Sequence, residues 1–396
     1  MSYPLAGITV LDLSRLQSGP SCSQILGYLG AYVIKIEDVN GGDVTRIDNA
    51  NNSSTDDSHF TIFNNSKESI TLNLKTPEGK KILEKLILKS DIVLENFSHG
   101  IMNKLGFSWE NIKNINPKII YASIKGFNDS DIYNNYKSFE TTAQAISGLM
   151  SANRDSNQIP KFAPIGVSDS GAGLHMVIGI LSALMQRESE GIGQKIEVSL
   201  YDSMVNLMRI ELMRYINIDN AEERSFDPIG NNSIIFKCNP LGPDDFIVIH
   251  LAGEMLESVL ILIGREDLLE TLNEEDLYRK SPNENIITEI EKWTKTKSKM
   301  DAFHTLAKAG IWCAPIMNPM EVIQDPYLIK QNMVTEISDD VRGNYKTIGL
   351  PIKFELTEPN IKKAPKYGEH TDKILKTILD LSEDEITTLK DSGVVL

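Results

Sequence analysis

Apolar and polar residues follow two different periods along residues 1–200. Short runs rich in Val, Ile and Leu are typical of buried strands, and they lie at 8–13, 32–37, 69–74, 92–94, 119–124 and 195–199. Longer segments with helical spacing lie between or after them, at 20–29, 77–88, 171–187 and 201–215. Strands that alternate with helices form parallel sheets with helices on both faces, so we expect an α/β fold.

The pattern changes after residue 216, and a chain of 396 residues has room for two domains. Residues 217–233 are rich in Asn, Asp, Glu and Pro, which predicts a linker. A smaller unit is expected over 234–330, and a last segment, 331–396, ends in two amphipathic helices. The elements expected there are strands at 234–236, 246–249 and 334–337, and helices at 255–263, 283–295, 299–309, 371–379 and 383–389.

Composition excludes several classes of function. The net charge of −15 argues against generic binding of nucleic acid or of an anionic membrane. Three widely spaced cysteines and six scattered histidines give neither a disulfide framework nor a metal site, so no metal is expected. The N-terminus lacks a basic, apolar leader, and no apolar run approaches a bilayer span, so we expect a soluble cytoplasmic protein. The turn at 14–20 lacks G-x-G-x-x-G, which disfavours a dinucleotide site.

One carboxylate stands out, Asp169, which lies between Ser168 and Ser170 just ahead of an apolar helical run. A carboxylate at a helix start meets unpaired N–H groups and the positive end of the helix dipole, which favour its ionised form. Gly171 and Gly173 remove side-chain bulk, so we expect an exposed nucleophile with open space for a substrate. Taken alone, however, Ser-Asp-Ser ahead of a helix is more typical of an ordinary N-cap.

The rest of the chain resembles class III CoA-transferases, through motifs that run in order along nearly its whole length. They are PLAGITVLDLSR at 4–15, LGAYVIKIE at 29–37, GGD at 41–43, FNNSK at 63–67, DIVLENF at 91–97, GIGQKI at 191–196 and APKYGEHT at 364–371. YKSFE at 136–140 and RGN at 342–344 are most similar to the formyl-CoA:oxalate branch. The resemblance implies a large Rossmann-like domain over 1–216, a smaller α+β domain, a C-terminal segment that returns to the large domain, and an interlocked homodimer.

The resemblance also implies roles for individual residues. Asp169 is the expected nucleophile, with Gln17 and Glu140 beside it, and it passes CoA from an acyl-CoA to a small carboxylic acid through an aspartyl anhydride and thioester. Backbone N–H groups near Gly171 and Gly173 are expected to stabilise the oxyanions. CoA is then a substrate and covalent intermediate, not a permanently bound cofactor. The residues implied to bind it are Gln17, Ser18, Leu72, Lys75, Asn96, Phe97, Ser98, Lys104 and Lys137.

The chain departs from the family pattern at two places. Asp38 stands where many relatives have an arginine near the adenine, and Lys35, Arg46 or Lys67 are the expected substitutes. Residues 228–233, PIGNNS, are shorter and poorer in glycine than the lid of formyl-CoA transferases, which leaves the identity of the acid pair open.

Two other functions stay open from the sequence. An acyl-CoA racemase of the same family would pair its aspartate with an upstream histidine, but no histidine lies between His99 and His175. A non-catalytic CoA-binding protein is disfavoured because Gln17, Glu140 and Asp169 are all present. Each residue also has an ordinary structural interpretation: a loop amide for Gln17, a helix-start charge for Glu140 and a solvated surface charge for each lysine.

Overall fold

The computed structural model describes residues 2–46, 58–129, 132–133, 136–213, 215–216, 232–272, 282–340 and 342–396. The chain divides into two compact units. One contains Met1–Ile218 and Asn332–Leu396, and the other contains Asp219–Gln331. Most of the predicted linker and of the 228–233 lid lies outside the described residues.

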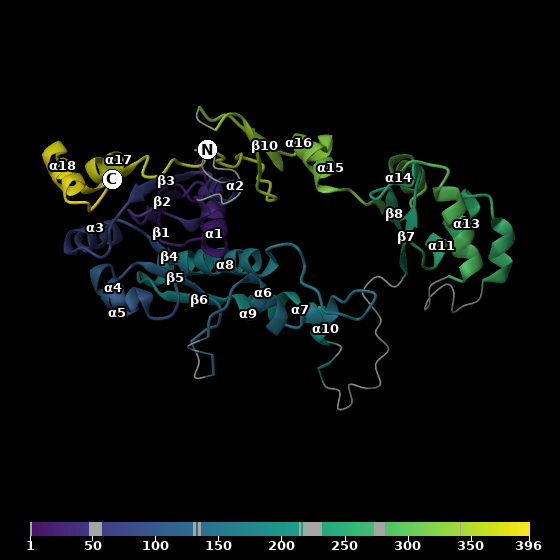
Figure 1. Cartoon of the computed structure of the whole chain (residues 1–396), viewed down its shortest axis with the longest axis horizontal. Coiled ribbons are helices and arrows are strands. Elements are labelled where there is room, and N and C mark those ends of the chain that lie inside the picture. The colour runs from purple at the N-terminus through teal and green to yellow at the C-terminus, as the bar shows by residue number, and fades with distance from the viewer. Residues whose placement is uncertain are drawn as a thin grey trace. The chain divides into compact units, whose positions relative to one another are not determined.

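A six-stranded parallel sheet organises the larger unit (Figure 1). Its strands, in the order β3-β2-β1-β4-β5-β6, are β1 (Thr9–Asp12), β2 (Tyr32–Glu37), β3 (Lys67–Thr71), β4 (Ile92–Glu95), β5 (Ile120–Lys125) and β6 (Lys195–Ser199). The register sets Leu11 of β1 beside Ile34 on one side and Val93 on the other. This is the strand order of a doubly wound Rossmann fold, so the predicted α/β architecture is confirmed. In such sheets ligands bind outside the carboxyl ends of the strands where the order reverses, here between β1 and β4.

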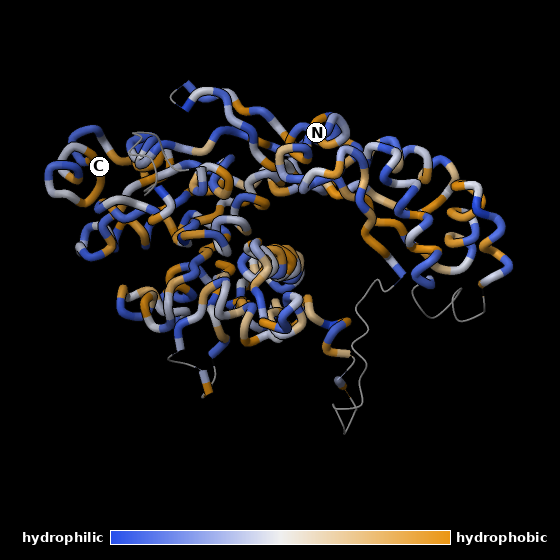
Figure 2. Tube along the Cα trace, turned by 45° about the vertical axis from the view of Figure 1, so that its right-hand side comes forward, coloured by the Kyte–Doolittle hydropathy of each residue, from blue (hydrophilic) through white to orange (hydrophobic). Residues whose placement is uncertain are grey.

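Helices cover both faces of this sheet. Helices α1 (Ser18–Tyr28) and α8 (Val167–Glu190) pack on one face, where Met176 and Ile180 join a core with Val33 and Leu94. The opposite face is covered by α3 (Pro77–Leu88), α5 (Trp109–Ile115), α17 (Thr371–Leu379) and α18 (Glu383–Asp391). Figure 2 shows hydrophobic residues gathered along these packed elements and hydrophilic residues on many of the outer turns.

Helix α8 is the one described helix that is long and apolar enough to cross a membrane by length and composition. This is weak evidence for a span, because core helices of soluble proteins pass the same test. Half of its apolar window is buried inside the protein, against the sheet and α1. The apolar residues of that buried half are therefore explained by the core they help to build.

The structure contains short helices that hydrophobic periodicity did not predict. They are α2 (Ser58–Asn64), α4 (Ile101–Leu105), α5, α6 (Glu140–Ile146) and α7 (Leu149–Ala152). Helices of four to seven residues complete no more than two turns, which is too short for a repeating apolar face. The predicted helix at 201–215 is instead two helices, α9 (Leu200–Leu207) and α10 (Arg209–Met213), which meet at Met208. Strand β3 begins at Lys67, a buried lysine that interrupts the apolar pattern.

The smaller unit is an α+β structure with its own core. An antiparallel sheet joins β7 (Ser233–Lys237), β8 (Phe246–His250) and β9 (Cys313–Pro315). Helices α11 (Glu254–Leu262), α13 (Glu284–Thr294) and α14 (Lys299–Lys308) bury Leu260, Ile290 and Leu306 against Ile247 and Ile249 of the sheet. Helices α15 (Pro319–Gln324) and α16 (Pro326–Lys330) complete this unit, while the hairpin of β10 (Val334–Ile337) and β11 (Tyr345–Ile348) belongs to the larger one.

Candidate active site

Asp169 is the third residue of α8 and lies in its first turn. The helix begins at Val167, earlier than predicted, and its N-cap is Gly166, which has no side-chain capping bond. The interpretation of Ser168-Asp169-Ser170 as an N-cap is therefore wrong, because these residues are already helical. The Ser170 N–H donates to the Gly166 carbonyl, but the N–H groups of Ser168 and Asp169 need acceptors from elsewhere in the chain.

Glu140 supplies those acceptors from a different helix, α6. Its carboxylate accepts hydrogen bonds from the N–H of Ser168 at 3.1 Å, the N–H of Asp169 at 2.8 Å and the Ser168 hydroxyl at 2.8 Å. The Gln144 side-chain amide donates to the same carboxylate at 2.7 Å and fixes its orientation. Glu140 is thus more than a charge at the start of its own helix, since it caps α8 and holds the backbone of Asp169.

Gln17 approaches the same helix end from the loop between β1 and α1. Its Nε2 donates to the Gly166 carbonyl at 3.2 Å and to the Ser170 hydroxyl at 3.0 Å. A Cβ atom at Gly166 would lie only 2.2 Å from this Nε2, so a glycine is required for the approach. The three residues predicted to be catalytic, Gln17, Glu140 and Asp169, therefore converge on the first turn of α8.

Ser18 and Asn96 extend this cluster toward the carboxyl end of β4. The Ser18 hydroxyl lowers the pKa of the nearby Asp169 carboxyl group, and it accepts from Asn96 Nδ2 at 3.1 Å. The Asn96 amide is also bonded to both backbone groups of Arg15, at 2.8 Å and 2.7 Å. Since its oxygen and nitrogen are both engaged inside the protein, Asn96 is placed to position Ser18 and the β1–α1 loop.

The environment of Asp169 raises the pKa of its carboxyl group. Burial is the main cause, the nearby Glu140 carboxylate adds to it, and the Ser18 hydroxyl opposes it, so the pKa is about 6. The expectation of a fully exposed and strongly ionised carboxylate is therefore corrected to a half-buried group. At pH 7 it is still ionised by roughly ten to one, and its higher basicity makes the carboxylate a better nucleophile.

The space beside Gly171 and Gly173 is not open to a ligand. A Cβ atom at Gly173 would lie 2.3 Å from Ser21 Oγ, and one at Gly171 would lie 2.9 Å from Leu207 Cδ1. These glycines let α8 pack closely on α1 and α9, which corrects the prediction of substrate space. Both N–H groups also lie beyond the first four of the helix and are used in its own hydrogen bonds, so the predicted role in an oxyanion hole is unsupported.

Neither histidine considered from the sequence meets the aspartate. His175 Nδ1 lies 2.7 Å from the Gly171 carbonyl and its Nε2 lies 3.4 Å from Asn206 Oδ1. His99 Nε2 lies 3.0 Å from the Phe127 carbonyl. Within the described ranges no histidine is hydrogen-bonded to Asp169, so the geometry offers no His/Asp pair for α-proton exchange.

A cavity of about 330 Å³ lies outside the carboxyl ends of β1, β2, β3 and β4. Four of the residues implied to bind CoA line it together: Leu72, Lys75, Phe97 and Ser98. Lys104 is exposed on α4, whose residues Ile101 and Leu105 line the cavity, but Lys104 itself does not. Lys137 is exposed in the segment before α6 and also lies outside the cavity lining.

The three cations expected to replace the family arginine at position 38 are engaged elsewhere. Lys35 pairs with Asp43 at 2.9 Å, Arg46 with Glu37 at 2.7 Å and Lys67 with Asp12 at 3.0 Å, and all six side chains are almost fully buried. Burial lowers the pKa of Lys67 to about 8 even though the neighbouring Asp12 opposes that shift. The predicted compensation by these residues is therefore wrong. Arg15, which the sequence reasoning did not assign, lines the cavity instead.

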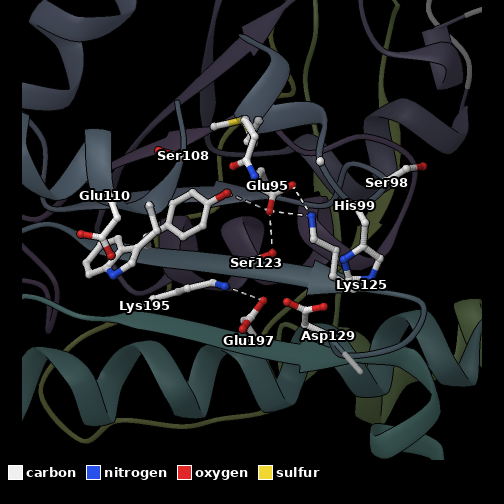
Figure 3. Close-up of a pocket in the computed structure, with 15 residues that line it drawn as sticks. Glu95, Ser98, His99, Ser108, Glu110, Ser123, Lys125, Asp129, Lys195 and Glu197 are labelled. Carbon is white, nitrogen blue, oxygen red and sulfur yellow. Dashed lines mark hydrogen bonds and ion pairs between the residues drawn. The ribbon is translucent and has the colours of Figure 1, made fainter. Parts of the chain in front are cut away.

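Figure 3 shows residues that line a second cavity, of about 550 Å³. Ser98 lines both this cavity and the first one. Glu95 is fully buried there and accepts hydrogen bonds from Lys125 Nζ at 2.7 Å and from Ser123 Oγ at 2.5 Å. This ion pair also holds the backbone of Phe97, whose N–H donates to Glu95 at 2.8 Å and whose carbonyl accepts from Lys125 at 2.6 Å. Glu95 lies in β4 and Lys125 in β5. A charged residue within an otherwise apolar strand is the sequence feature from which this buried ion pair could have been predicted.

The described part of the chain contains no group of three or more His, Cys, Asp or Glu side chains arranged to hold a metal ion. The side chains gathered around Asp169 are instead a second carboxylate, three hydroxyls and three amides: Glu140, Ser18, Ser168, Ser170, Gln17, Asn96 and Gln144. This arrangement suits nucleophilic chemistry by a carboxylate.

Residues 5–371 match CoA-transferase family III, and the chain belongs to that family of enzymes. It is 37% identical to the formyl-CoA:oxalate CoA-transferases of Escherichia coli and Shigella dysenteriae, over 417 aligned positions and 100% of both chains. Its fold is similar to the crystal structure of a CaiB/BaiF family protein from Brucella suis, with a TM-score of 0.82, 27% identity and coverage of 96% and 100% of the two chains. A protein from Mycobacterium tuberculosis shares the fold at 24% identity, with a TM-score of 0.78 and coverage of 94% and 98%.

Proposed function

We propose that this enzyme moves CoA from an acyl-CoA thioester to a small carboxylic acid, with Asp169 as the covalent nucleophile. The observation that carries the proposal is the convergence of Gln17, Glu140 and Asp169, from three separate segments, on the first turn of α8. If this turn were only capped, the Glu140 carboxylate would suffice as the acceptor. Here a second carboxyl group, that of Asp169, lies beside Glu140 and has a raised pKa.

The proposed reaction begins when an Asp169 carboxylate oxygen attacks the thioester carbonyl carbon. A C–O bond forms, the C–S bond breaks, and CoA leaves as a thiolate, which gives a mixed anhydride. The thiolate then attacks the aspartyl carbonyl, so that a C–S bond forms and the donor acid leaves as its carboxylate. An acceptor carboxylate reverses both steps and regenerates Asp169, with no net change in protons.

The surrounding side chains have separate roles in this proposal. Glu140 holds the Asp169 backbone and keeps the nucleophile basic. Gln17 donates a side-chain N–H to Ser170 of this turn, and its amide is suited to an oxyanion once it releases Ser170. Ser18 and Asn96 act as positioning residues, because Asn96 holds both Ser18, which lies near the Asp169 carboxyl group, and the loop that carries Gln17.

CoA is proposed to lie across the carboxyl ends of the strands of the large domain. Its nucleotide end would occupy the 330 Å³ cavity lined by Leu72, Lys75, Phe97 and Ser98. Lys104 and Lys137 are exposed outside that cavity, so they remain proposed contacts to parts of the substrate that reach the surface.

Formyl-CoA and oxalate are the proposed substrates. Relatives with that name are 37% identical over their whole length. The lid at 228–233 differs in composition from the one expected of such enzymes, and 228–231 lie outside the described residues. We therefore propose the formyl-CoA:oxalate reaction as the first pair to test among small dicarboxylates and monocarboxylates.

A homodimer in the cytoplasm is part of the proposal. Leu174, Ile178 and Met185 form one stripe of α8 and are each more than half exposed in the single chain. Large apolar side chains gathered on a helix face are typical of a protein interface.

We also propose that the chain is divided as its sequence predicts. Residues 1–216 form the CoA-binding domain, 217–233 a linker, 234–330 a small domain and 331–396 a segment that returns to the large domain.

Chromatographic assay of CoA transfer tests the proposed function. Purified enzyme is given formyl-CoA with oxalate, succinate or acetate, and each acyl-CoA product is quantified. Formation of oxalyl-CoA with release of formate is expected. If no acceptor yields a new acyl-CoA while CoA still binds, the proposed function is wrong and the non-catalytic alternative gains support.

A further inference from the structure

Arg15 lies where β1 passes into α1, and it presents a cation to the 330 Å³ cavity. Its backbone N–H and carbonyl are both bonded to the Asn96 amide, so the start of the side chain is fixed. Its guanidinium carbon lies 5.5 Å from the centroid of the Phe97 ring. Across the ranges that the structure describes, this guanidinium makes no hydrogen bond and no ion pair.

The acidic groups of the same cavity are already engaged. Glu37 is bonded to Arg46 and to the Ser69 hydroxyl, and Asp38 accepts from the backbone and side chain of Asn40. Arg15 is therefore a cation in a ligand-sized cavity with no anionic partner among the described side chains. A planar guanidinium in such a place is suited to binding a phosphate through two parallel hydrogen bonds.

The phosphate that Arg15 can reach follows from its place in the chain. Gln17 is two residues away, which is at most about 7 Å along the backbone. Gln17 in turn contacts the helix end that carries Asp169. In an acyl-CoA the pyrophosphate lies between the pantetheine arm and the adenosine, and the 3′-phosphate lies at the far end from the thioester. The pyrophosphate is thus the phosphate group closer to the reacting end and to Arg15.

We propose that Arg15, whose guanidinium carbon lies over the Phe97 ring, binds the pyrophosphate of the acyl-CoA substrate. Lys75 lines the same cavity and adds a second, more mobile charge. The contact with the ring restricts where the guanidinium can lie before the ligand arrives, which reduces the entropy lost on binding. This inference rests on the proposed function, since it takes an acyl-CoA as the ligand of the cavity.

Three ligands distinguish which phosphate group Arg15 contacts. CoA carries both the pyrophosphate and the 3′-phosphate, dephospho-CoA lacks the 3′-phosphate, and pantetheine lacks the pyrophosphate and the nucleotide. Their dissociation constants are measured by calorimetry for the wild type, Arg15→Ala and Arg15→Lys. Lys81→Ala is the matched control, because Lys81 is exposed on α3 outside the cavity and its loss removes the same charge. Thermal unfolding of each variant checks that it is folded.

We expect Arg15→Ala to weaken CoA and dephospho-CoA equally, by about 10- to 100-fold, as for the loss of hydrogen bonds between charged groups. Pantetheine binding should be unchanged, Arg15→Lys should recover part of the loss, and Lys81→Ala should match the wild type. Equal affinities in Arg15→Ala and wild type, an equal loss for pantetheine, or a loss for CoA alone would each overturn the inference. Because binding is measured without turnover, a wild type that binds CoA but transfers none would contradict only the proposed function.

Discussion

The Glu140 carboxylate accepts a 2.8 Å hydrogen bond from the backbone N–H of Asp169 while its charge raises the pKa of the Asp169 side chain. One residue therefore both fixes the position of the proposed nucleophile and tunes its basicity. This coupling depends on α6 and α8, which are separated in sequence but meet at the first turn of α8.

Glu140→Gln is expected to shift the acid limb of the pH–activity profile to lower pH. The neutral amide keeps one of the two oxygen acceptors that serve the α8 N–H groups, and it removes the repulsion that favours protonated Asp169. The measurement is kcat/KM from pH 4.5 to 8 for the variant and the wild type. Because titration of the substrate affects both pH profiles equally, the difference between the variant and the wild-type profile reports the enzyme alone.

Glu188→Gln is the matched control for that experiment, because Glu188 is exposed near the other end of the same helix. Its profile should overlay that of the wild type, with an acid limb near pH 6. An unshifted limb in Glu140→Gln would mean that the limb does not report Asp169 or that Glu140 does not set its pKa.

Asp169→Asn is expected to stabilise the fold at neutral pH. The folded-state pKa is raised from 3.8 to about 6, so the native state holds this proton more tightly than the unfolded chain. Wild-type stability therefore falls as pH rises between those two values and stays reduced above them. The amide removes that penalty, which corresponds to about 1–3 kcal/mol.

The check is urea unfolding of both proteins at pH 4, 5, 6 and 7.5. The stability difference should be near zero at pH 4, grow up to pH 6 and then remain level. A variant that is less stable than the wild type at pH 7.5 would show that the carboxylate is stabilised by its surroundings instead of being destabilised by burial.

Gly173→Ala is expected to lower both stability and activity. The new methyl group would meet Ser21 Oγ at 2.3 Å and the Ser18 carbonyl at 2.9 Å, so α1 and α8 would have to separate. Overpacking of this kind costs about 1–3 kcal/mol, and it would move Ser18 away from Asp169. Thermal unfolding and transfer rate measure the two effects.

Gly179→Ala on the same helix provides the comparison. Its Cβ would approach the Ile196 side chain at 3.1 Å, which needs only a small shift, and alanine favours the helix by about 1 kcal/mol. This variant should keep its activity and stability. If both variants behave alike, close packing at Gly173 is not what positions the site.

Lys125→Met is expected to weaken binding of the CoA thioester with little change in kcat. Lys125 and Glu95 hold both backbone polar groups of Phe97, a residue that lines the proposed nucleotide cavity. A KM increase of about tenfold corresponds to 1.4 kcal/mol lost from that arrangement. Lys195→Met is the control, since Lys195 lines the neighbouring cavity but pairs with Glu197. A loss of kcat at constant KM in Lys125→Met would contradict the positioning role.

The regular part of the fold was predictable because its signals are local. Buried strands such as β2 and β4 are rich in Val, Ile and Leu, and α3 begins with a proline in its first turn, so pattern and structure agree. The site was predictable only through resemblance to a family, since Gln17, Glu140 and Asp169 are far apart in sequence. Their meeting depends on how short helices such as α6 are placed, and those leave no periodic signal.

The role of Gly173, and the choice between ligand-binding and structural cations, could not be predicted from the sequence for a different reason. A glycine reads the same in a sequence whether it opens space for a ligand or admits a neighbouring helix, and only the contact with Ser21 distinguishes the two. The cations Lys35, Arg46 and Lys67 likewise could not be told from ligand-binding ones until their buried carboxylate partners were located.

Trapping of the covalent intermediate tests the central claim most directly. The enzyme is mixed with formyl-CoA in the absence of an acceptor, quenched with hydroxylamine or borohydride, digested and analysed by mass spectrometry, with Asp169→Asn treated in parallel. We predict a hydroxamate or a reduced side chain at Asp169, formed only with the thioester and absent from the variant. An unmodified Asp169 peptide in an enzyme that transfers CoA under the same conditions, or a modification at another carboxylate, would contradict Asp169 as the nucleophile.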